Sequence, residues 1–145
     1  PEGFMHTNNF FYSNLLKYCP VDKIIGLDAR GFIFASVLAH RTKGPLILAR
    51  KAGKLPGPII QKEFNLEYGT ATLEIQTTSI EQGDRVIIID DLMATGGTVQ
   101  ACIDIVHDLG GSITAVACAI DLASLGGSRR IKDQDIKFYS GAEYQ

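Results

Sequence analysis

The chain has 145 residues, 46% of them hydrophobic, which favours a single globular domain with one core. Its 14 Lys and Arg residues against 16 Asp and Glu residues give a net charge of -2, which argues against a general nucleic-acid binder, because such proteins usually carry a basic face. No apolar run reaches the roughly 18 residues of a membrane span, so we expect neither nucleic acid nor a membrane as a partner.

The first part of the chain predicts alternating helices and strands. Apolar residues at helical spacing predict a helix over residues 4–18, ended by Pro20. The next predicted elements are a strand, a turn, a helix and a strand, over residues 23–27, 28–31, 32–41 and 45–49. This order predicts an α/β fold with a mainly parallel sheet flanked by helices, in which ligands bind beyond the carboxyl ends of the strands.

From Arg50 the chain becomes basic and irregular. Arg50, Lys51 and Lys54 are followed by two prolines, so residues 50–58 predict a loop. A charged loop alone is usually solvated, but its position after a strand favours a role in binding an anion. Residues 63–68 and 71–76 lie on either side of a Gly-Thr pair, and the alternation of Leu73 and Ile75 with polar neighbours predicts a β-hairpin, an element that often closes over a site.

The most informative stretch runs from residue 85 to residue 100. Val86–Ile89 are four consecutive β-branched residues and predict a strand buried on both faces. Asp90 and Asp91 follow, then a loop of small and hydroxyl residues, Ala94–Thr98, and then a helical pattern that ends at two glycines, residues 110 and 111. The pattern therefore predicts a buried strand, a loop and the start of a helix.

That loop predicts a phosphate site. The first N-H groups of a helix have no partner inside it, and the positive end of the helix dipole faces the same way. Gly96 and Gly97 allow close approach, and Thr95 and Thr98 supply hydroxyl donors. The two aspartates upstream suit sugar hydroxyls or a hydrated Mg2+. Neither a Walker loop nor a dinucleotide fingerprint is present, so the stretch predicts a site for a sugar phosphate.

The last part of the chain predicts a buried strand over residues 115–120, a loop or short helical turn over 126–130 and a closing strand over 136–140. Arg129 and Arg130 lie in the turn and either contact phosphate or face solvent. Three cysteines stand singly, without metal-binding or redox spacing, which favours a reduced, cytoplasmic protein; they are Cys19, Cys102 and Cys118.

The stretch from Val86 to Thr98 resembles the signature with which phosphoribosyltransferases bind phosphoribosyl pyrophosphate (PRPP). Three other segments, residues 26–32, 50–57 and 66–75, are similar to the pyrophosphate loop, basic segment and mobile catalytic loop of the adenine phosphoribosyltransferases. The resemblance implies a type I phosphoribosyltransferase fold for residues 1–145 as a single domain. It also implies a function in purine salvage, making AMP and pyrophosphate from adenine and PRPP.

The resemblance implies a role for each matching residue. Glu67 would be the catalytic acid or base, with Tyr68 beside it in the mobile loop. Asp90 and Asp91 would hold the ribose, and the cofactor Mg2+ would be carried by PRPP, with water rather than a direct bond linking it to these carboxylates. The expected ligands of the 5'-phosphate are Ala94, Thr95, Gly96, Gly97 and Thr98. The expected ligands of pyrophosphate are Asp28, Ala29, Arg30, Gly31, Arg50, Lys51 and Lys54, with Arg30 also near the base and a cis bond expected between Asp28 and Ala29.

Two alternatives stay open. One is another purine phosphoribosyltransferase, for xanthine or hypoxanthine, and the other is a non-catalytic regulator that senses PRPP. Enzymes for hypoxanthine and guanine resemble the signature but carry Asp where this chain has Ala94, so the proton chemistry must come from elsewhere, and Glu67 is the candidate.

The resemblance has two further implications. The adenine phosphoribosyltransferases form two-fold homodimers, so we expect a homodimer here. Their N-terminal segment that covers the base is expected to be absent from residues 1–145.

Overall fold

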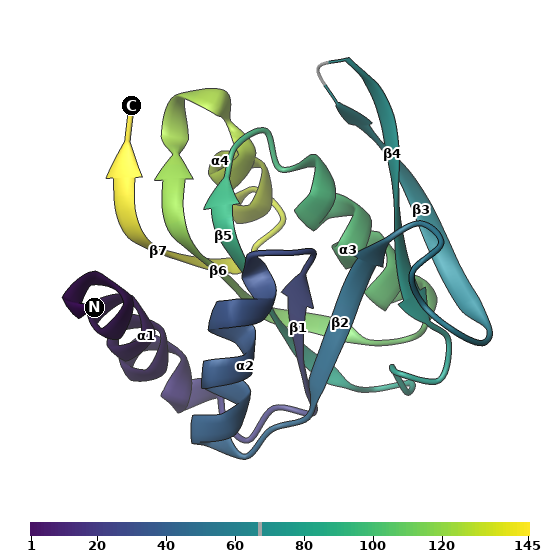
Figure 1. Cartoon of the computed structure of the whole chain (residues 1–145), viewed down its shortest axis with the longest axis horizontal. Coiled ribbons are helices and arrows are strands. Elements are labelled where there is room, and N and C mark those ends of the chain that lie inside the picture. Colours follow the sequence, from purple (N-terminus) through teal and green to yellow (C-terminus); the bar gives the residue numbers. More distant parts are fainter. Residues whose placement is uncertain (67) are drawn as a thin grey trace.

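The computed structural model describes residues 1–66 and 68–145, and within them one sheet has its strands in the order β3-β4-β2-β1-β5-β6-β7 (Figure 1). The strands are β1 (Lys23–Leu27), β2 (Leu46–Lys51), β3 (Ile59–Leu66), β4 (Gly69–Gln76), β5 (Arg85–Met93), β6 (Ser112–Leu122) and β7 (Lys137–Tyr144). The helices are α1 (Glu2–Leu15), α2 (Gly31–Thr42), α3 (Gly97–Asp108) and α4 (Gly127–Lys132), with short 3-10 helices η1 (Leu16–Tyr18) and η2 (Ala123–Leu125).

The sheet is parallel at its centre and antiparallel at one edge. β1 pairs in parallel with β2 and β5, and β6 pairs in parallel with β5 and β7. β4 pairs antiparallel with β2 and with β3, which forms the predicted hairpin. The predicted α/β fold with a mainly parallel sheet and flanking helices is therefore confirmed.

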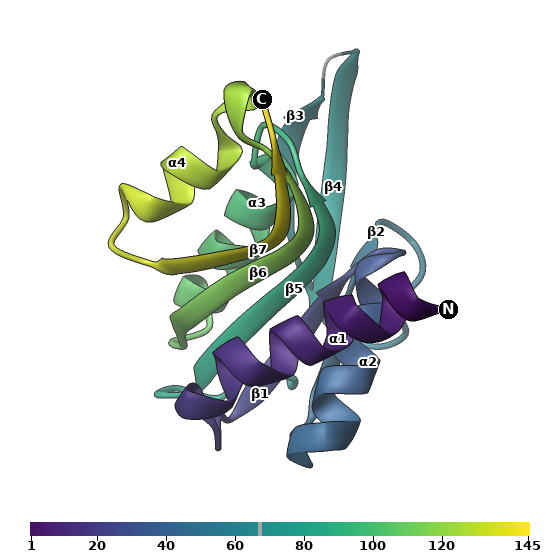
Figure 2. The ribbon, with the colours of Figure 1, turned by 90° about the vertical axis from the view of Figure 1, so that its left-hand side faces the viewer.

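Two layers of helices bury the two faces of the sheet (Figure 2). Ile87 and Ile89 face α1 and α2, together with Phe11 and Leu38. Val86 and Ile88 face α3 and α4, in the cluster whose other members include Ile103, Val106 and Ile131. All four residues of the run Val86–Ile89 are fully buried, as their lack of alternation predicts. This burial anchors β5 in the middle of the sheet, so the loop after it starts from a fixed point.

Several predicted boundaries were wrong. Arg50 and Lys51 were expected in a loop but belong to β2, because they pair with Glu74 and Leu73 of β4. The central strand runs on through the acidic pair to Met93, because β6 continues beside it. The hairpin begins at residue 59 rather than 63. By contrast, the stretch 126–130, predicted as a loop or a short helical turn, lies mostly in the short helix α4, in agreement with the second alternative.

Two further observations concern the chain's environment. Among the residues described, none of the helices is both long enough and apolar enough to cross a membrane. The three cysteines are free thiols, two of them buried. Burial in apolar surroundings raises the pKa of Cys102 and of Cys118, which leaves these thiols inert and consistent with core packing.

Candidate functional site

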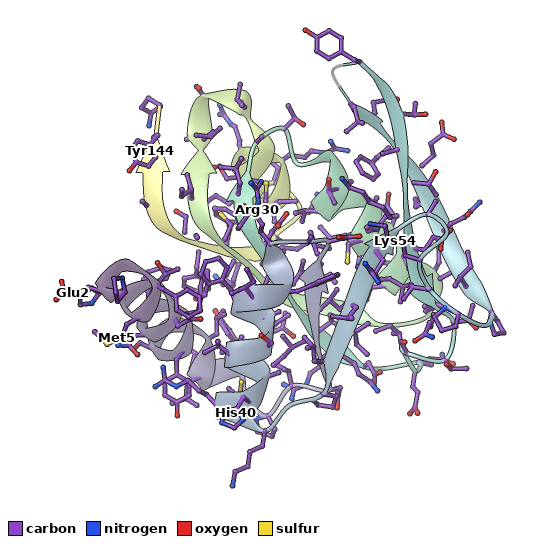
Figure 3. All side chains as sticks on the ribbon, viewed as in Figure 1. Glu2, Met5, Arg30, His40, Lys54 and Tyr144 are labelled. Carbon is purple, nitrogen blue, oxygen red and sulfur yellow. The ribbon has the colours of Figure 1, made fainter. Side chains whose placement is uncertain are left out.

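Most of the predicted site residues that the structure describes lie at or beyond the carboxyl ends of β1, β2 and β5. The turn 28–31 follows β1, the basic segment starts at the end of β2, and the loop before α3 follows β5. Figure 3 shows two members of the group, Arg30 and Lys54, beyond the ends of β1 and β2. Parallel strands place their carboxyl ends at one edge of the sheet, so segments far apart in the sequence meet there.

The phosphate loop, residues 94–98, has the conformation that an anion site needs. Gly96 has a positive φ of 86°, in the left-handed region that glycine adopts without strain. It precedes the first residue of α3, and no side chain within the described residues caps this end of the helix. The N-H groups of the first turn are therefore available to an anion, which the helix dipole also attracts.

The acidic pair lies between this loop and the turn 28–31. The backbone N-H of Asp91 donates to Oδ1 of Asp90 over 2.8 Å, and Oδ2 of Asp91 forms a salt bridge of 2.7 Å with Nε of Arg30. A Cβ atom at Gly31 would lie 2.8 Å from the carbonyl oxygen of Ile89 and 3.1 Å from Oδ1 of Asp90. Only glycine fits there, and its small size lets the turn sit directly against β5.

The two aspartates differ in their surroundings, and burial raises the pKa of Asp90 from its usual 3.8 to about 8. The backbone N-H of Asp91 acts in the opposite direction, and the Asp91 side chain raises the pKa again because two carboxylates repel each other. Arg30 lowers it only slightly, since it pairs with Asp91. In the ligand-free protein at neutral pH, Asp90 therefore carries a proton.

We expect this proton to make stability depend on pH. Because the folded protein holds the proton between about pH 4 and pH 8 while the unfolded chain releases it, the stabilising contribution is full below about pH 4 and is lost as the pH rises toward 8. In this window the free energy of unfolding of the wild type should fall, relative to Asp90→Asn, by up to about 1.4 kcal/mol per pH unit. Urea unfolding at several pH values, without phosphate ligands and with a chelator present, measures this difference.

Asp133→Asn is the matched control, because Asp133 is an exposed carboxylate at the end of α4. Its unfolding free energy should run parallel to that of the wild type over the same pH range. Parallel curves for Asp90→Asn and the wild type would contradict the raised pKa.

Asp28 organises the basic segment. Its side chain is 4% exposed, and its Oδ2 accepts a hydrogen bond of 3.1 Å from the backbone N-H of Lys51. The same oxygen lies 3.7 Å from Nε of Arg50 and 3.8 Å from Nζ of Lys54. The peptide bond between Asp28 and Ala29 is cis, as the sequence resemblance implies. The buried carboxylate of Asp28 thus holds the cationic side chains of Arg50 and Lys54 close together at the carboxyl end of β1.

Two cavities lie along this edge, with volumes of about 920 and 360 Å³. The whole phosphate loop lines the larger cavity, whereas Asp28, Ala29, Arg30 and Lys51 line the smaller one. The side chains that line both cavities come from β3, β5 and α3 and are Phe64, Leu66, Asp90, Leu92 and Thr98. The two cavities are therefore neighbouring parts of one elongated cleft, with a phosphate loop in one part and cations in the other.

Some predicted residues lie apart from the cavities. Gly31, Arg50 and Lys54 do not line either one, although the latter two reach Asp28. Tyr68 is 90% exposed and also lies outside both. Glu67, the predicted catalytic residue, lies outside the residues that the structure describes.

Sequence reasoning missed the inner face of the hairpin. Phe64 packs partly against the core, and its ring lies within 3.5 Å of a Cβ position built on Gly97, so β3 touches the phosphate loop. Leu66 is half exposed and faces the cleft. Alternate residues of a strand share one face, so Ile60, Lys62, Phe64 and Leu66 lie on the same face of β3. This spacing was the sequence signal that could have predicted which side chains of β3 face the cleft.

The described residues contain no group of three or more His, Cys, Asp or Glu side chains placed to hold a metal ion. A metal at this cleft would therefore take most of its ligands from a bound phosphate compound and from water. The acidic pair fits such a role, because Mg2+ keeps several waters and is usually bound through one or two carboxylates.

Comparisons with known proteins agree with one another. The family of the phosphoribosyl transferase domain matches residues 11–143. An adenine phosphoribosyltransferase of Marinomonas sp. is 49% identical over 86% of this chain and 69% of its own length. One from Actinobacillus succinogenes is 42% identical over 99% of this chain and 79% of its own length. The structure of the Trypanosoma brucei enzyme in complex with AMP, pyrophosphate and ribose-5-phosphate superposes with a TM-score of 0.89 at 28% identity, covering 99% of this chain and 65% of that one.

Proposed function

Since this chain belongs to the adenine phosphoribosyltransferases, within the phosphoribosyltransferase family, we propose that the cleft between the phosphate loop and the basic segment is its active site. The chain transfers the phosphoribosyl group of PRPP to adenine and releases pyrophosphate, with AMP as the product. This is the activity of a purine-salvage enzyme, a pentosyltransferase.

The observation that carries the proposal is the separation of two anion-binding regions along one cleft. The helix-terminal amides of α3 lie at one end, and Arg30 and Lys51 lie at the other, with Asp90 and Asp91 between them. PRPP has the same order of groups, a phosphate, a sugar with free hydroxyls and a pyrophosphate. We therefore assign the 5'-phosphate to residues 94–98, the ribose to the acidic pair and the pyrophosphate to the basic end.

The reaction breaks the bond between the anomeric carbon of the ribose and the pyrophosphate oxygen, and forms a bond from that carbon to a ring nitrogen of adenine. The sugar passes through a state with oxocarbenium character while negative charge builds on the leaving pyrophosphate. Arg30, Lys51 and the amides of the turn 28–31 stabilise that charge. Arg50 and Lys54, held near Asp28 in the free protein, are within reach to move toward pyrophosphate when it binds.

In this proposal Glu67 is the general acid or base that transfers a proton to or from the purine. As the bond to the sugar forms, adenine loses one ring N-H proton, and a carboxylate beside the ring accepts it; in the reverse direction the same group returns the proton to the base. The assignment rests on the resemblance of residues 66–75 to the family's catalytic loop. It is supported by Ala94, since a side chain of this kind cannot perform proton chemistry from the phosphate loop.

Mg2+ is the proposed cofactor. Asp90 and Asp91 are the residues that would hold the ion, through its water shell, together with the phosphate groups of PRPP. When bound, it neutralises part of the charge of the pyrophosphate. In this proposal Asp90 would release its proton to solvent when the ligand binds, and the resulting carboxylate would accept hydrogen bonds from the ribose hydroxyls.

Product formation with PRPP, Mg2+ and each of four bases tests the proposed function. Adenine should give AMP, and hypoxanthine, xanthine and orotate should give rates lower by at least about a hundredfold, because a site built to hydrogen-bond one base leaves its polar groups unpaired with another. A faster reaction with hypoxanthine or xanthine would place the chain with the other purine transferases. Binding of PRPP without turnover of any base would instead indicate the sensor.

We also propose that the protein is a homodimer, through the face formed by α2 and β2. Ile33 on α2 is 52% exposed, and Leu46 and Leu48 on β2 are each 38% exposed, although β2 is an inner strand. A second copy would cover these apolar side chains, in line with the two-fold dimers of the family. Sedimentation at micromolar protein should give a dimer, and the variant with both leucines replaced by lysine should sediment as a monomer. A monomeric wild type would contradict the proposal.

The proposed location is the cytoplasm. The free thiols support it, because an oxidising compartment would favour disulfides. PRPP, the nucleotide product and the free base are all polar small molecules. The proposal therefore includes no nucleic acid and no membrane as a partner.

A further inference from the structure

The short helix α4 is fixed against the phosphate loop. The backbone N-H of Gly127, its first residue, donates to the carbonyl oxygen of Ala94 over 3.0 Å. A Cβ atom at Gly127 would lie 2.4 Å from that oxygen and 2.8 Å from the backbone nitrogen of Gly96. This close contact leaves no space between the start of α4 and the phosphate loop. It therefore fixes the position of α4 relative to a phosphate bound in the loop.

Two adjacent arginines on α4 differ in where they lie. Arg130 lines the larger cavity together with the phosphate loop, whereas Arg129 does not line either cavity. The backbone around Arg130 is held on both sides: its N-H donates to the carbonyl of Gly126 over 3.0 Å, and its own carbonyl accepts from Nε2 of Gln134 over 3.0 Å. Gln134 is tied in turn to Gln100 of α3 over 2.6 Å. The structure thus separates two residues that the sequence leaves equivalent.

Arg130 also carries an uncompensated charge. Within the described part of the chain its guanidinium forms no salt bridge. Asp104, an acidic residue of the same cavity, accepts a hydrogen bond of 3.0 Å from Gln100 instead. A guanidinium presents several donors in a planar fork that matches the oxygens of a phosphate. An arginine without an acidic partner beside a phosphate loop is therefore placed to pair with a bound anion.

We propose that Arg130 binds the 5'-phosphate of PRPP and AMP. The loop 94–98 contributes amides and hydroxyls but no cationic side chain, so a charged contact at this end of the cleft must come from another element. α4 supplies it. The inference rests on the proposed function, because it takes the loop as the 5'-phosphate site, and it adds a residue to that site.

Separate binding of the two halves of PRPP tests the proposal. Ribose 5-phosphate and pyrophosphate are titrated calorimetrically into the wild type, Arg130→Gln, Arg130→Lys and the control Arg129→Gln. Arg130→Gln should weaken ribose 5-phosphate by about tenfold or more, because one charge-assisted contact is lost. Pyrophosphate affinity should stay within about twofold, since its cations lie at the other end of the cleft. Arg130→Lys should retain part of the affinity, and Arg129→Gln all of it.

Steady-state kinetics of the same variants provide a second test. Arg130→Gln should raise KM for PRPP by a similar factor, with a smaller change in kcat, while its melting temperature matches that of Arg129→Gln because both side chains are exposed. Equal ribose 5-phosphate affinity in the two glutamine variants would overturn the proposal, and so would an equal loss for both ligands. A wild type that makes AMP but shows either result would leave the proposed function standing, whereas a wild type that makes no AMP would remove the function itself.

Discussion

Replacement of both Asp90 and Asp91 by asparagine should lower kcat/KM by at least about a hundredfold while the protein stays folded. The two carboxylates lie at the end of the central strand, between the phosphate loop and the cationic turn, and Asp90 lines both cavities. Asparagine has the same shape, so the strand keeps its packing. It replaces one acceptor oxygen of the carboxylate by an NH2 donor, and it offers no negative charge to a hydrated Mg2+. Steady-state rates with PRPP varied at saturating adenine measure the effect.

The control is Asp108→Asn, which removes a carboxylate from the exposed salt bridge between α3 and Lys62 of β3. An exposed pair of this kind contributes little, so its rate and stability should stay close to those of the wild type. Circular dichroism and thermal unfolding establish that the double variant is folded. A folded double variant with wild-type kcat/KM would show that the acidic pair is not part of the site.

Glu67→Gln should reduce kcat by about a hundredfold to ten-thousandfold, the usual range for loss of a general acid or base. Its PRPP affinity should stay nearly unchanged, because the proton transfer belongs to the transition state and not to ground-state binding. Its neighbour Leu66 lines both cavities, which supports a catalytic position for this part of the chain. Single-turnover rates, combined with a titration of PRPP, separate the chemical step from binding.

Glu81→Gln serves as the control, since Glu81 is an exposed residue in the connection between β4 and β5 and far along the chain from the hairpin tip. Its kcat should equal that of the wild type. The opposite pattern for Glu67→Gln, with a normal kcat and a collapse of PRPP affinity, would make this residue a ligand contact and not an acid or base.

The sequence predicts the centre of this molecule better than its edges. Val86–Ile89 could only be a buried strand, and the small residues after the acidic pair could only be a loop before a helix, because local chemistry alone sets those choices. The cis bond between Asp28 and Ala29 was implied by resemblance and is present. The boundaries of β2 were wrong because its last residues become a strand only through pairing with β4, a partner more than twenty positions away.

Long-range contacts also explain the parts of the site that were not predicted. The carboxylate of Asp28 forms salt bridges with Arg50 and Lys54, and no local sequence pattern reveals a salt bridge between residues so far apart in the chain. The two arginines of α4 are neighbours with equal charge. The contact of Gly127 with the phosphate loop positions α4, and in that position Arg130 and not Arg129 lines the cleft.

The junction between the hairpin and the rest of the sheet has a mechanical consequence. β4 joins β2 through two residue pairs, Arg50 with Glu74 and Lys51 with Leu73, while all eight residues of β4 pair with β3. The β2–β4 pairing thus links the hairpin to the backbone that carries Arg50 and Lys51, while Lys62 and Phe64 hold the hairpin against α3 and the phosphate loop. A displacement of the hairpin that opened the cleft would shift these two cations at the same time, so opening and release of pyrophosphate would be coupled.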